Sequence, residues 1–151
     1  TKSRHIWWKI RPHVDFNTVE FRVCDAQRSL VNIEMIIGLV QALVRTIDYN
    51  QDYDHDYKYE YLTDSLWKAS SKGLECSIID PLTKNIISMK DMIKEMINYC
   101  RDSLFYFNNL HIENTVKNIL KNGNEADMQL DIYDKHGMDY MKQYLIKKVE
   151  Y

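Results

Sequence analysis

The sequence predicts an α+β fold, in which a short antiparallel β-hairpin is followed by about five or six helices. Near the N-terminus, apolar and polar residues alternate with a period of two, and from residue 30 onward apolar residues recur mainly at helical spacing. The composition agrees, because 151 residues with 45% apolar side chains, 4 Gly and 2 Pro are typical of a packed globular domain. We therefore expect a single domain over residues 1–151.

Residues 5–11 and 18–24 form the predicted hairpin, because every second residue of each stretch is apolar. The connector 12–17 is short and contains Pro, Asp and Asn, which favour turns. If the strands pair directly, their apolar residues must share the core face. This register predicts burial of Val19, Phe21 and Val23, and it places four charged residues together on the opposite face: Lys9, Arg11, Glu20 and Arg22.

Residues 30–47 form the most apolar predicted helix, with Ser29 as its expected N-cap. This predicted helix carries apolar residues on almost every side, and a domain of this size rarely buries a helix on all sides. Residues 48–61 read as a surface loop, and a helix over residues 63–72 should follow.

The second half of the chain is predicted from turn and capping signals. Ser88 and Asp91 have the spacing of a capping box at the start of a helix. Glycines at positions 73, 123 and 137 mark helix ends. The remaining predicted elements are a small hairpin over 75–79 and 85–88, and helices over 109–122, 125–135 and 138–149.

Charge and cysteine content exclude several classes of protein. A formal net charge of −2 gives no general attraction for nucleic acid or an anionic membrane, so neither is an expected partner. No uncharged apolar run approaches the roughly 20 residues that span a bilayer, and the start does not resemble a signal peptide. The three cysteines have no C-x-x-C spacing, which favours buried thiols in a reducing cytoplasm.

Most of the motifs that could bind a metal or take part in catalysis are better explained by structural or surface roles. The loop 52–56 (DYDHD) offers carboxylates and an imidazole to a divalent cation, but it lacks the Gly and distal Glu of a calcium loop, which favours a solvated loop. The histidines are scattered, which favours structural or surface roles: His5, His13, His111 and His136. Neither a P-loop nor a G-x-G-x-x-G motif occurs.

Glu20 and Arg22 are the strongest candidates. Two residues apart on a strand, they project from one face, roughly 7 Å apart. The carboxylate can hold a cation while the guanidinium holds a phosphate, a division of roles that suits magnesium–nucleotide chemistry. The alternative to this functional interpretation is that Glu20 and Arg22 only form an exposed ion pair on the strand surface.

The flanking residues resemble a known family. Residues 7–12 (WWKIRP) and 16–27 (FNTVEFRVCDAQ) resemble the W-W-x-I-R-P…F-x-T-x-E-x-R-x-x-D stretch of carboxylate–amine ligases related to glutamate–cysteine ligase of the bacterial type-two branch. Further along, residues 67–74 (WKASSKGL) and 123–129 (GNEADMQ) resemble the W-R-A…G-L and G-x-G-A-x-R-Q segments of the same family.

The resemblance implies a fold similar to glutamine synthetase, and a reaction that joins a glutamate-type carboxylate to an amine through an acyl phosphate made with MgATP. It makes Glu20 a metal ligand, Arg22 a phosphate contact and Arg11 a supporting anion contact, while Asp25 fixes the strand end or orients Arg22. Trp8 is expected in the core, and Trp7 either lines the site or packs.

Family members are much longer, and their W-W…E-x-R block lies in the second half. The chain is therefore identified as the C-terminal portion of a ligase whose site is completed by an N-terminal half. Because that half would normally cover part of this chain, we expect an unusually large exposed apolar patch beside the hairpin or on the predicted helix 30–47, and self-association as its relief. Alone it should be inactive and bind neither Mg²⁺ nor ATP in an ordered way, because Glu20 offers at most two of the six oxygens that Mg²⁺ requires.

Several residues depart from the family pattern: Lys9, Asp64, Ser65, Ser71, Lys72, Glu125 and Met128. Lys9 replaces an expected acid and Met128 an expected arginine, which changes the charge expected of a phosphate site. A second hypothesis is therefore a degenerate ligase domain that binds a protein partner. A third is a structural or oligomerisation domain.

Overall fold

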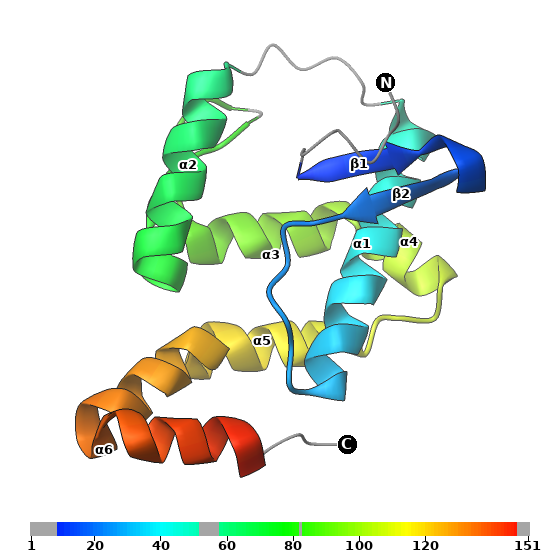
Figure 1. Ribbon diagram of the computed structural model, residues 1–151. Coiled ribbons are helices and arrows are strands. Elements are labelled where there is room, and N and C mark those ends of the chain that lie inside the picture. The colour runs from blue at the N-terminus through cyan, green and yellow to red at the C-terminus, as the bar shows by residue number, and fades with distance from the viewer. Residues whose placement is uncertain (1–8, 52–57, 82, 148–151) are drawn as a thin grey trace.

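The computed structural model describes residues 9–51, 58–81 and 83–147 and confirms the α+β class. Two small antiparallel sheets accompany a set of helices (Figure 1). The strands and α-helices are β1 Ile10–His13, β2 Thr18–Phe21, α1 Leu30–Asn50, α2 Tyr59–Lys72, β3 Ser77–Ile79, β4 Ile86–Ser88, α3 Met89–Tyr99, α4 Arg101–Tyr106, α5 Ile112–Asn122 and α6 Glu125–Lys147.

The first hairpin forms as predicted, but the predicted burial of its apolar face is wrong. Ile10 pairs with Phe21, so the apolar residues of the two strands share a face. The turn uses a 3₁₀ segment, Val14–Phe16, followed by Asn17 in the left-handed region. Phe21 is half-buried, whereas Val19 and Val23 are each 53% exposed. The two-stranded sheet pairs with no other described strand, and its exposure shows that the rest of the described chain covers it poorly. Trp7 and Trp8 lie outside the described residues.

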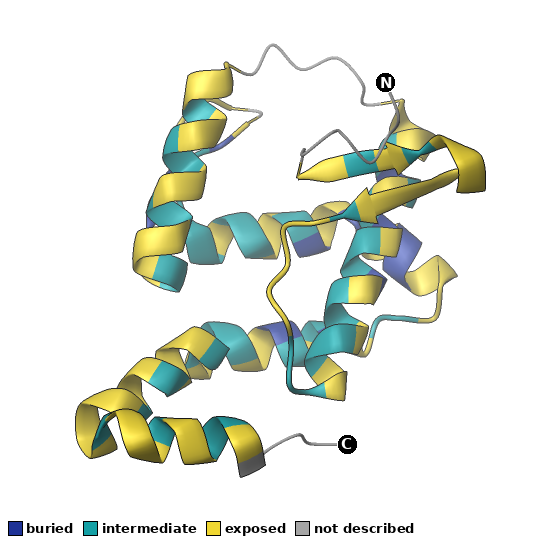
Figure 2. Cartoon of the chain, in the orientation of Figure 1, coloured by how far each residue is buried: buried dark blue, intermediate teal, exposed yellow. Residues whose placement is uncertain are grey.

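Helix α1 has one narrow buried stripe rather than an all-round apolar environment. Its buried residues, Gly38, Ala42 and Thr46, are four apart and face α4 and α5. Ser29 occupies the N-cap position, but its hydroxyl makes no capping hydrogen bond. Figure 2 shows exposed positions along α1. Apolar residues are among them, including Leu30, Val31, Ile37 and Val44.

By length and composition alone, α1 could cross a membrane, since an 18-residue window of it has a mean hydropathy of 1.6. The sequence predicts no membrane-spanning segment, because it has no uncharged apolar run of that length, and Glu34 and Arg45 interrupt the apolar residues of this helix. Core helices of soluble proteins can be equally long and apolar, and α1 packs against α4 and α5, although only 22% of that window is buried. The helix is therefore weak evidence for a membrane.

The hydrophobic core lies where α1, α3, α4 and α5 meet. Its buried members are Ala42, Ile97, Cys100, Leu104, Ile112 and Val116. Gly38 allows a close approach of α1 to the start of α5, because a Cβ at this position would lie 3.2 Å from the side chains of Asn109 and Ile112. A small residue at the crossing thus fixes how closely the two helices pack.

The region between residues 58 and 91 follows the predicted turn and cap signals with one shift. Helix α2 starts at Tyr59, earlier than the predicted residue 63, and ends before Gly73, which has a φ of 53°. Strands β3 and β4 pair as predicted. The Ser88 hydroxyl accepts a hydrogen bond from the Asp91 backbone N–H at 3.0 Å and donates to the Asp91 carboxylate at 2.7 Å. Residues 52–56, the acidic loop, lie outside the described residues.

The C-terminal helices are also close to their predicted bounds. The helix that begins after Ser88 is divided at Cys100 into α3 and α4. Helix α5 ends at Asn122, and Gly123 follows with a φ of 92°. Gly137, with a φ of 77°, kinks α6 where the sequence predicts a break between two helices.

Candidate functional site

The predicted site residues meet on the first hairpin. Arg11 and Glu20 are cross-strand partners in the register of β1 and β2. The Arg11 Nε donates to Glu20 Oε2 at 2.7 Å, and Arg11 Nη2 lies 2.5 Å from the same oxygen. The Arg22 Nε lies 3.7 Å from the other oxygen, Oε1. The three side chains therefore share one face, as predicted, and form one ion-pair cluster.

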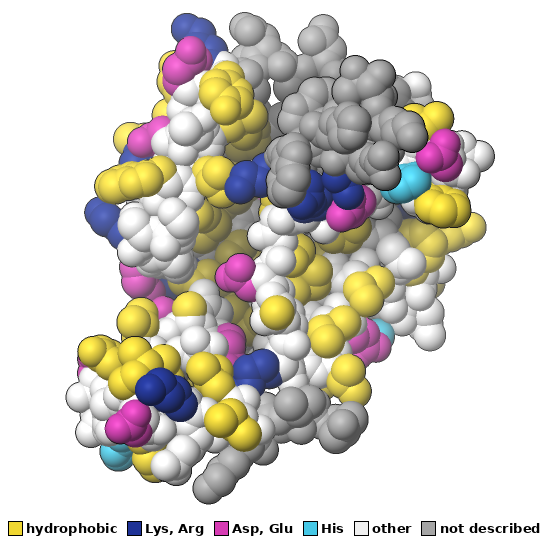
Figure 3. All heavy atoms as spheres, in the orientation of Figure 1, with side chains coloured by type: hydrophobic (Ala, Val, Ile, Leu, Met, Phe, Trp, Pro, Cys, Tyr) yellow, Lys and Arg dark blue, Asp and Glu magenta, His cyan; other side chains and the backbone are white. Residues whose placement is uncertain are grey.

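Counted over these three side chains alone, two guanidinium groups and one carboxylate give a net charge of +1. Arg11 is the more enclosed arginine, with 16% of its side chain exposed, whereas Glu20 is 43% exposed. An excess of guanidinium charge on a partly exposed face suits an anion, and the planar fork of arginine matches phosphate or carboxylate oxygens. In Figure 3, dark-blue and magenta side chains gather over the hairpin.

Glu20 fits a metal ion only in part. Its Oε2 is held by Arg11 and its Oε1 lies 3.7 Å from Arg22 Nε, so a cation at Oε1 would have to replace the longer ion pair with Arg22. Within the described residues, no group of three His, Cys, Asp or Glu side chains could hold a metal ion. The remaining ligands of a Mg²⁺ ion at Glu20 would have to come from outside the described residues.

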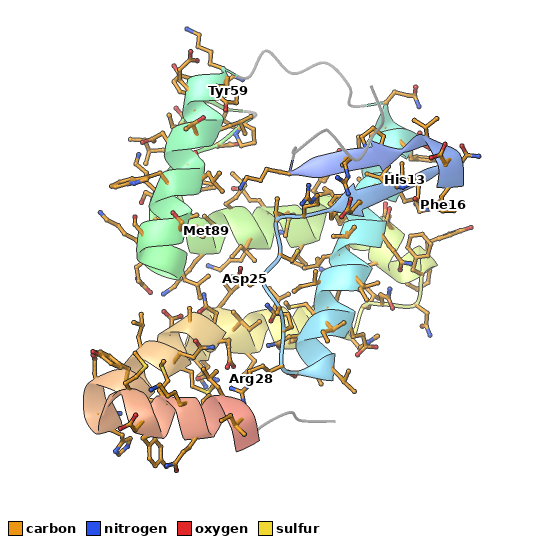
Figure 4. The ribbon with its side chains drawn as sticks, viewed as in Figure 1. His13, Phe16, Asp25, Arg28, Tyr59 and Met89 are labelled. Carbon is orange, nitrogen blue, oxygen red and sulfur yellow. The ribbon has the colours of Figure 1, made fainter. Side chains whose placement is uncertain are left out.

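Asp25 does not have its expected role. It lies in the extended connector between β2 and α1, four residues beyond the strand end at Phe21 (Figure 4). Its carboxylate makes no hydrogen bond or ion pair with any described residue, and only its backbone carbonyl accepts, from the Gln27 amide at 3.2 Å. Asp25 therefore neither orients Arg22 nor ends the strand.

Arg28 is an organising residue that sequence reasoning missed. Its Nη1 donates to Glu125 Oε1 at 2.9 Å, its Nη2 donates to the Tyr144 backbone carbonyl at 3.1 Å, and its guanidinium carbon lies 4.4 Å from the centre of the Tyr144 ring. These contacts tie the start of α1 to both halves of α6 (Figure 4). Glu125, a departure from the family pattern, thus has a partner 97 residues away in sequence, which no local pattern could reveal.

Of the other departures, Met128 and Asp64 make contacts away from the hairpin cluster, whereas Lys9 lies next to it. Met128 is half-exposed, and its sulfur accepts a hydrogen bond from the Tyr144 hydroxyl at 2.8 Å. Asp64 pairs with Lys68 on the surface of α2. Lys9 touches the hairpin through its backbone, where its carbonyl accepts from the Arg22 N–H at 2.8 Å.

Most of the described histidines and cysteines pack against other side chains or are buried. His13 stacks against Phe16 with ring centres 4.6 Å apart, and His111 lies 2.9 Å from Glu34. His5 lies outside the described residues. All three cysteines are free thiols. Cys76 and Cys100 are buried as predicted, but Cys24 is exposed, because it lies in the uncovered connector after β2.

Comparisons with known proteins agree with the motif resemblance. The model of glutamate–cysteine ligase family 2 matches residues 1–144. A relative from Gloeobacter violaceus, named "Putative glutamate--cysteine ligase 2", is 31% identical over 136 residues, which cover 88% of this chain and 37% of the relative. A relative of the same name from Solibacter usitatus is 29% identical over 153 residues, which cover 99% of this chain and 40% of the relative. The chain thus spans at most 40% of the length of these curated relatives.

Proposed function

The chain belongs to glutamate–cysteine ligase family 2, and on this premise we propose that it is the C-terminal part of an ATP-dependent carboxylate–amine ligase. The proposed reaction joins a glutamate-type carboxylate to an amine through an acyl phosphate. The observation that carries the proposal is the cluster of Arg11, Glu20 and Arg22, because it combines two anion-binding groups with one carboxylate on a single face.

Arg22 and Arg11 have the chemistry to contact the phosphoryl group. Charge develops on the phosphoryl oxygens during transfer, and fixed guanidinium groups stabilise that charge without reorganising. The Glu20 carboxylate holds Arg11 through two donors on one oxygen, which fixes the direction of its guanidinium plane. Arg22, 29% exposed, lies on the other side of the same carboxylate.

A Mg²⁺ ion, when bound, would neutralise the phosphate oxygens and orient the nucleotide. Glu20 is the described residue best placed to hold it, through Oε1. Because a single carboxylate supplies few of six ligands, the proposal assigns the other acidic ligands to the part of the ligase that relatives have beyond this chain.

The proposed site is therefore formed by two parts of the ligase. Residues 1–151 contribute the arginines and one carboxylate, and the N-terminal portion of the ligase is the required partner. Exposed apolar residues on the hairpin and α1, including Val19, Val23 and Ile37, support this, since a covered surface would stabilise them. Self-association is a second way to cover this surface. We expect the ligase to act in the cytoplasm, where free thiols stay reduced.

The test uses the full-length protein with glutamate, MgATP and hydroxylamine. Hydroxylamine attacks an acyl phosphate directly, forming a hydroxamate and releasing phosphate, so the assay does not depend on knowing the natural amine. We expect ATP-dependent hydroxamate formation. Arg22→Gln should lower its rate about 100-fold or more, the usual loss when one group that stabilises transition-state charge is removed.

Matched controls separate the site from general damage. Glu20→Gln keeps the side-chain shape and should lower the affinity for Mg²⁺, whereas Glu34→Gln, at an exposed carboxylate beside His111, should not. Arg101→Gln serves as the arginine control, because Arg101 is exposed on α4. Full turnover by Arg22→Gln would refute its role. A full-length protein that forms no hydroxamate with any carboxylate would favour the degenerate binding or oligomerisation domain.

A further inference from the structure

A cavity of about 520 Å³ lies between the C-terminal half of α1 and the segment formed by the end of α3 and by α4. It is separate from the Arg11–Glu20–Arg22 cluster and includes none of those residues. Its volume falls within the range of small-molecule sites, roughly 300–1,000 Å³. The wall from α1 carries Arg45 and Tyr49, and the facing wall carries Asp102, Ser103 and Tyr106.

Arg45 is held rigidly in this cavity. Its guanidinium carbon lies 4.1 Å from the centre of the Tyr106 ring and 5.6 Å from that of Tyr49. Its Nη1 donates to Ser103 Oγ at 3.1 Å. One of its five N–H donors is thus used, and stacking fixes the plane in which the others lie.

Arg45 is supported by two buried hydroxyl groups, those of Thr46 and Ser103, which form a chain of hydrogen bonds. The Thr46 hydroxyl donates to the Ala42 carbonyl at 2.8 Å, so its single proton is used. The Ser103 hydroxyl, 2.7 Å from Thr46 Oγ1, must therefore donate to Thr46, and its oxygen accepts from Arg45. Each hydroxyl of this buried pair thus has its proton and an acceptor site engaged, which makes the pair a fixed support for the guanidinium.

Asp102 supplies the opposite charge. It is exposed, lines the same cavity, and makes no ion pair or hydrogen bond with any described residue. Arg45 and Asp102 do not pair with each other, although both face one cavity. A cation and an anion that line one cavity without pairing can each bind the complementary charge of a zwitterion, and aromatic rings line the same cavity.

We propose that this cavity binds an α-amino acid with a flat apolar side chain. The carboxylate binds Arg45, the ammonium group binds Asp102, and the side chain stacks on the rings that line the cavity. The cavity is lined by the rings of Tyr99 and Phe105, and by those of Tyr49 and Tyr106, which already contact the Arg45 guanidinium. Because the site shares no residue with the hairpin cluster, this inference does not depend on the ligase reaction.

The test is calorimetry on the full-length protein with L-phenylalanine and two truncated analogues. 3-Phenylpropionate lacks the ammonium group, and 2-phenylethylamine lacks the carboxylate. L-Phenylalanine should bind with a Kd of the order of 1 mM or tighter, as expected for so small a ligand. Both analogues should bind at least tenfold more weakly. No binding of L-phenylalanine at several millimolar would overturn the proposal.

Two variants assign the charges. Asp102→Asn should weaken L-phenylalanine and 2-phenylethylamine about tenfold or more while leaving 3-phenylpropionate unchanged, and Arg45→Lys should weaken both carboxylate ligands. Asp131→Asn, at an exposed aspartate on α6, and Arg22→Gln, in the hairpin cluster, should change none of the affinities. An Asp102→Asn protein that loses 3-phenylpropionate equally would refute the zwitterion geometry. L-Phenylalanine binding that is indifferent to both cavity variants would show that the ligand binds elsewhere, and would also overturn the proposal.

Discussion

Leu104 is the largest fully buried side chain of the core, and its truncation measures how much stability that core supplies. It lies on α4 with none of its surface exposed, in the cluster that contains Ala42, Ile97 and Ile112. Leu104→Ala removes three buried carbons and leaves a cavity that helices from four parts of the chain would have to close. Substitutions of this kind cost about 3–5 kcal/mol. We expect a value near 3 kcal/mol, because half-buried neighbours such as Leu39 can move inward.

Urea unfolding followed by helical circular dichroism measures this loss. For an m-value of about 2 kcal/mol/M, a loss of 3 kcal/mol lowers the midpoint by about 1.5 M with the slope unchanged. Leu130→Ala is the matched control, because Leu130 is 62% exposed on α6. The same chemical change there should alter stability by about 0.5 kcal/mol or less. Equal losses in the two variants would refute the assignment of the core.

Three further predictions concern thiols, a helix cap and a helix crossing. Cys24 should react with a thiol reagent under native conditions, while Cys100 should react only on unfolding, because burial raises the pKa of its thiol. Equal reaction rates of the two thiols with a chromogenic disulfide reagent would contradict this. Ser88→Ala should cost about 1 kcal/mol in thermal unfolding, since Ser88 caps α3. Hydrogen bonds from Lys94 and Ser88, together with the charge of Lys94, lower the pKa of Asp91. The contribution of the Asp91 carboxylate to folding stability is therefore complete above the ordinary aspartate pKa of about 4, and it disappears as the pH falls through the lowered pKa. The stability difference between wild type and Asp91→Asn should shrink in acid, and a difference that grows in acid would contradict this pH dependence. Gly38→Leu should destabilise the fold by about 1–3 kcal/mol, because the larger side chain forces α1 and α5 apart. Gly38→Ala should change the free energy of unfolding by no more than about 1 kcal/mol, because the better helix propensity of alanine offsets the tight contact. Equal losses in the two variants, measured from denaturant midpoints, would contradict the close crossing.

The sequence by itself determined the features that depend on residues close together along the chain. The cap at Ser88, the helix ends before Gly73 and Gly123, and the kink at Gly137 all follow from local backbone preferences. Alternation in the first hairpin also placed Arg11, Glu20 and Arg22 on one face, because side chains on paired strands alternate with a fixed period. The hairpin cluster could therefore be predicted from the amino-acid sequence alone.

Only the tertiary structure decided which surfaces are covered and which distant residues meet. Periodicity shows that a face is apolar but not whether another element packs on it, so Val19 is expected in the core and yet is exposed. The pairing of Arg28 with Glu125, and of Arg45 with Ser103, joins residues 97 and 58 positions apart. Such contacts depend on how α1 crosses α4 and how α6 folds back, and those crossings arise from the packing of several helices together rather than from any one segment.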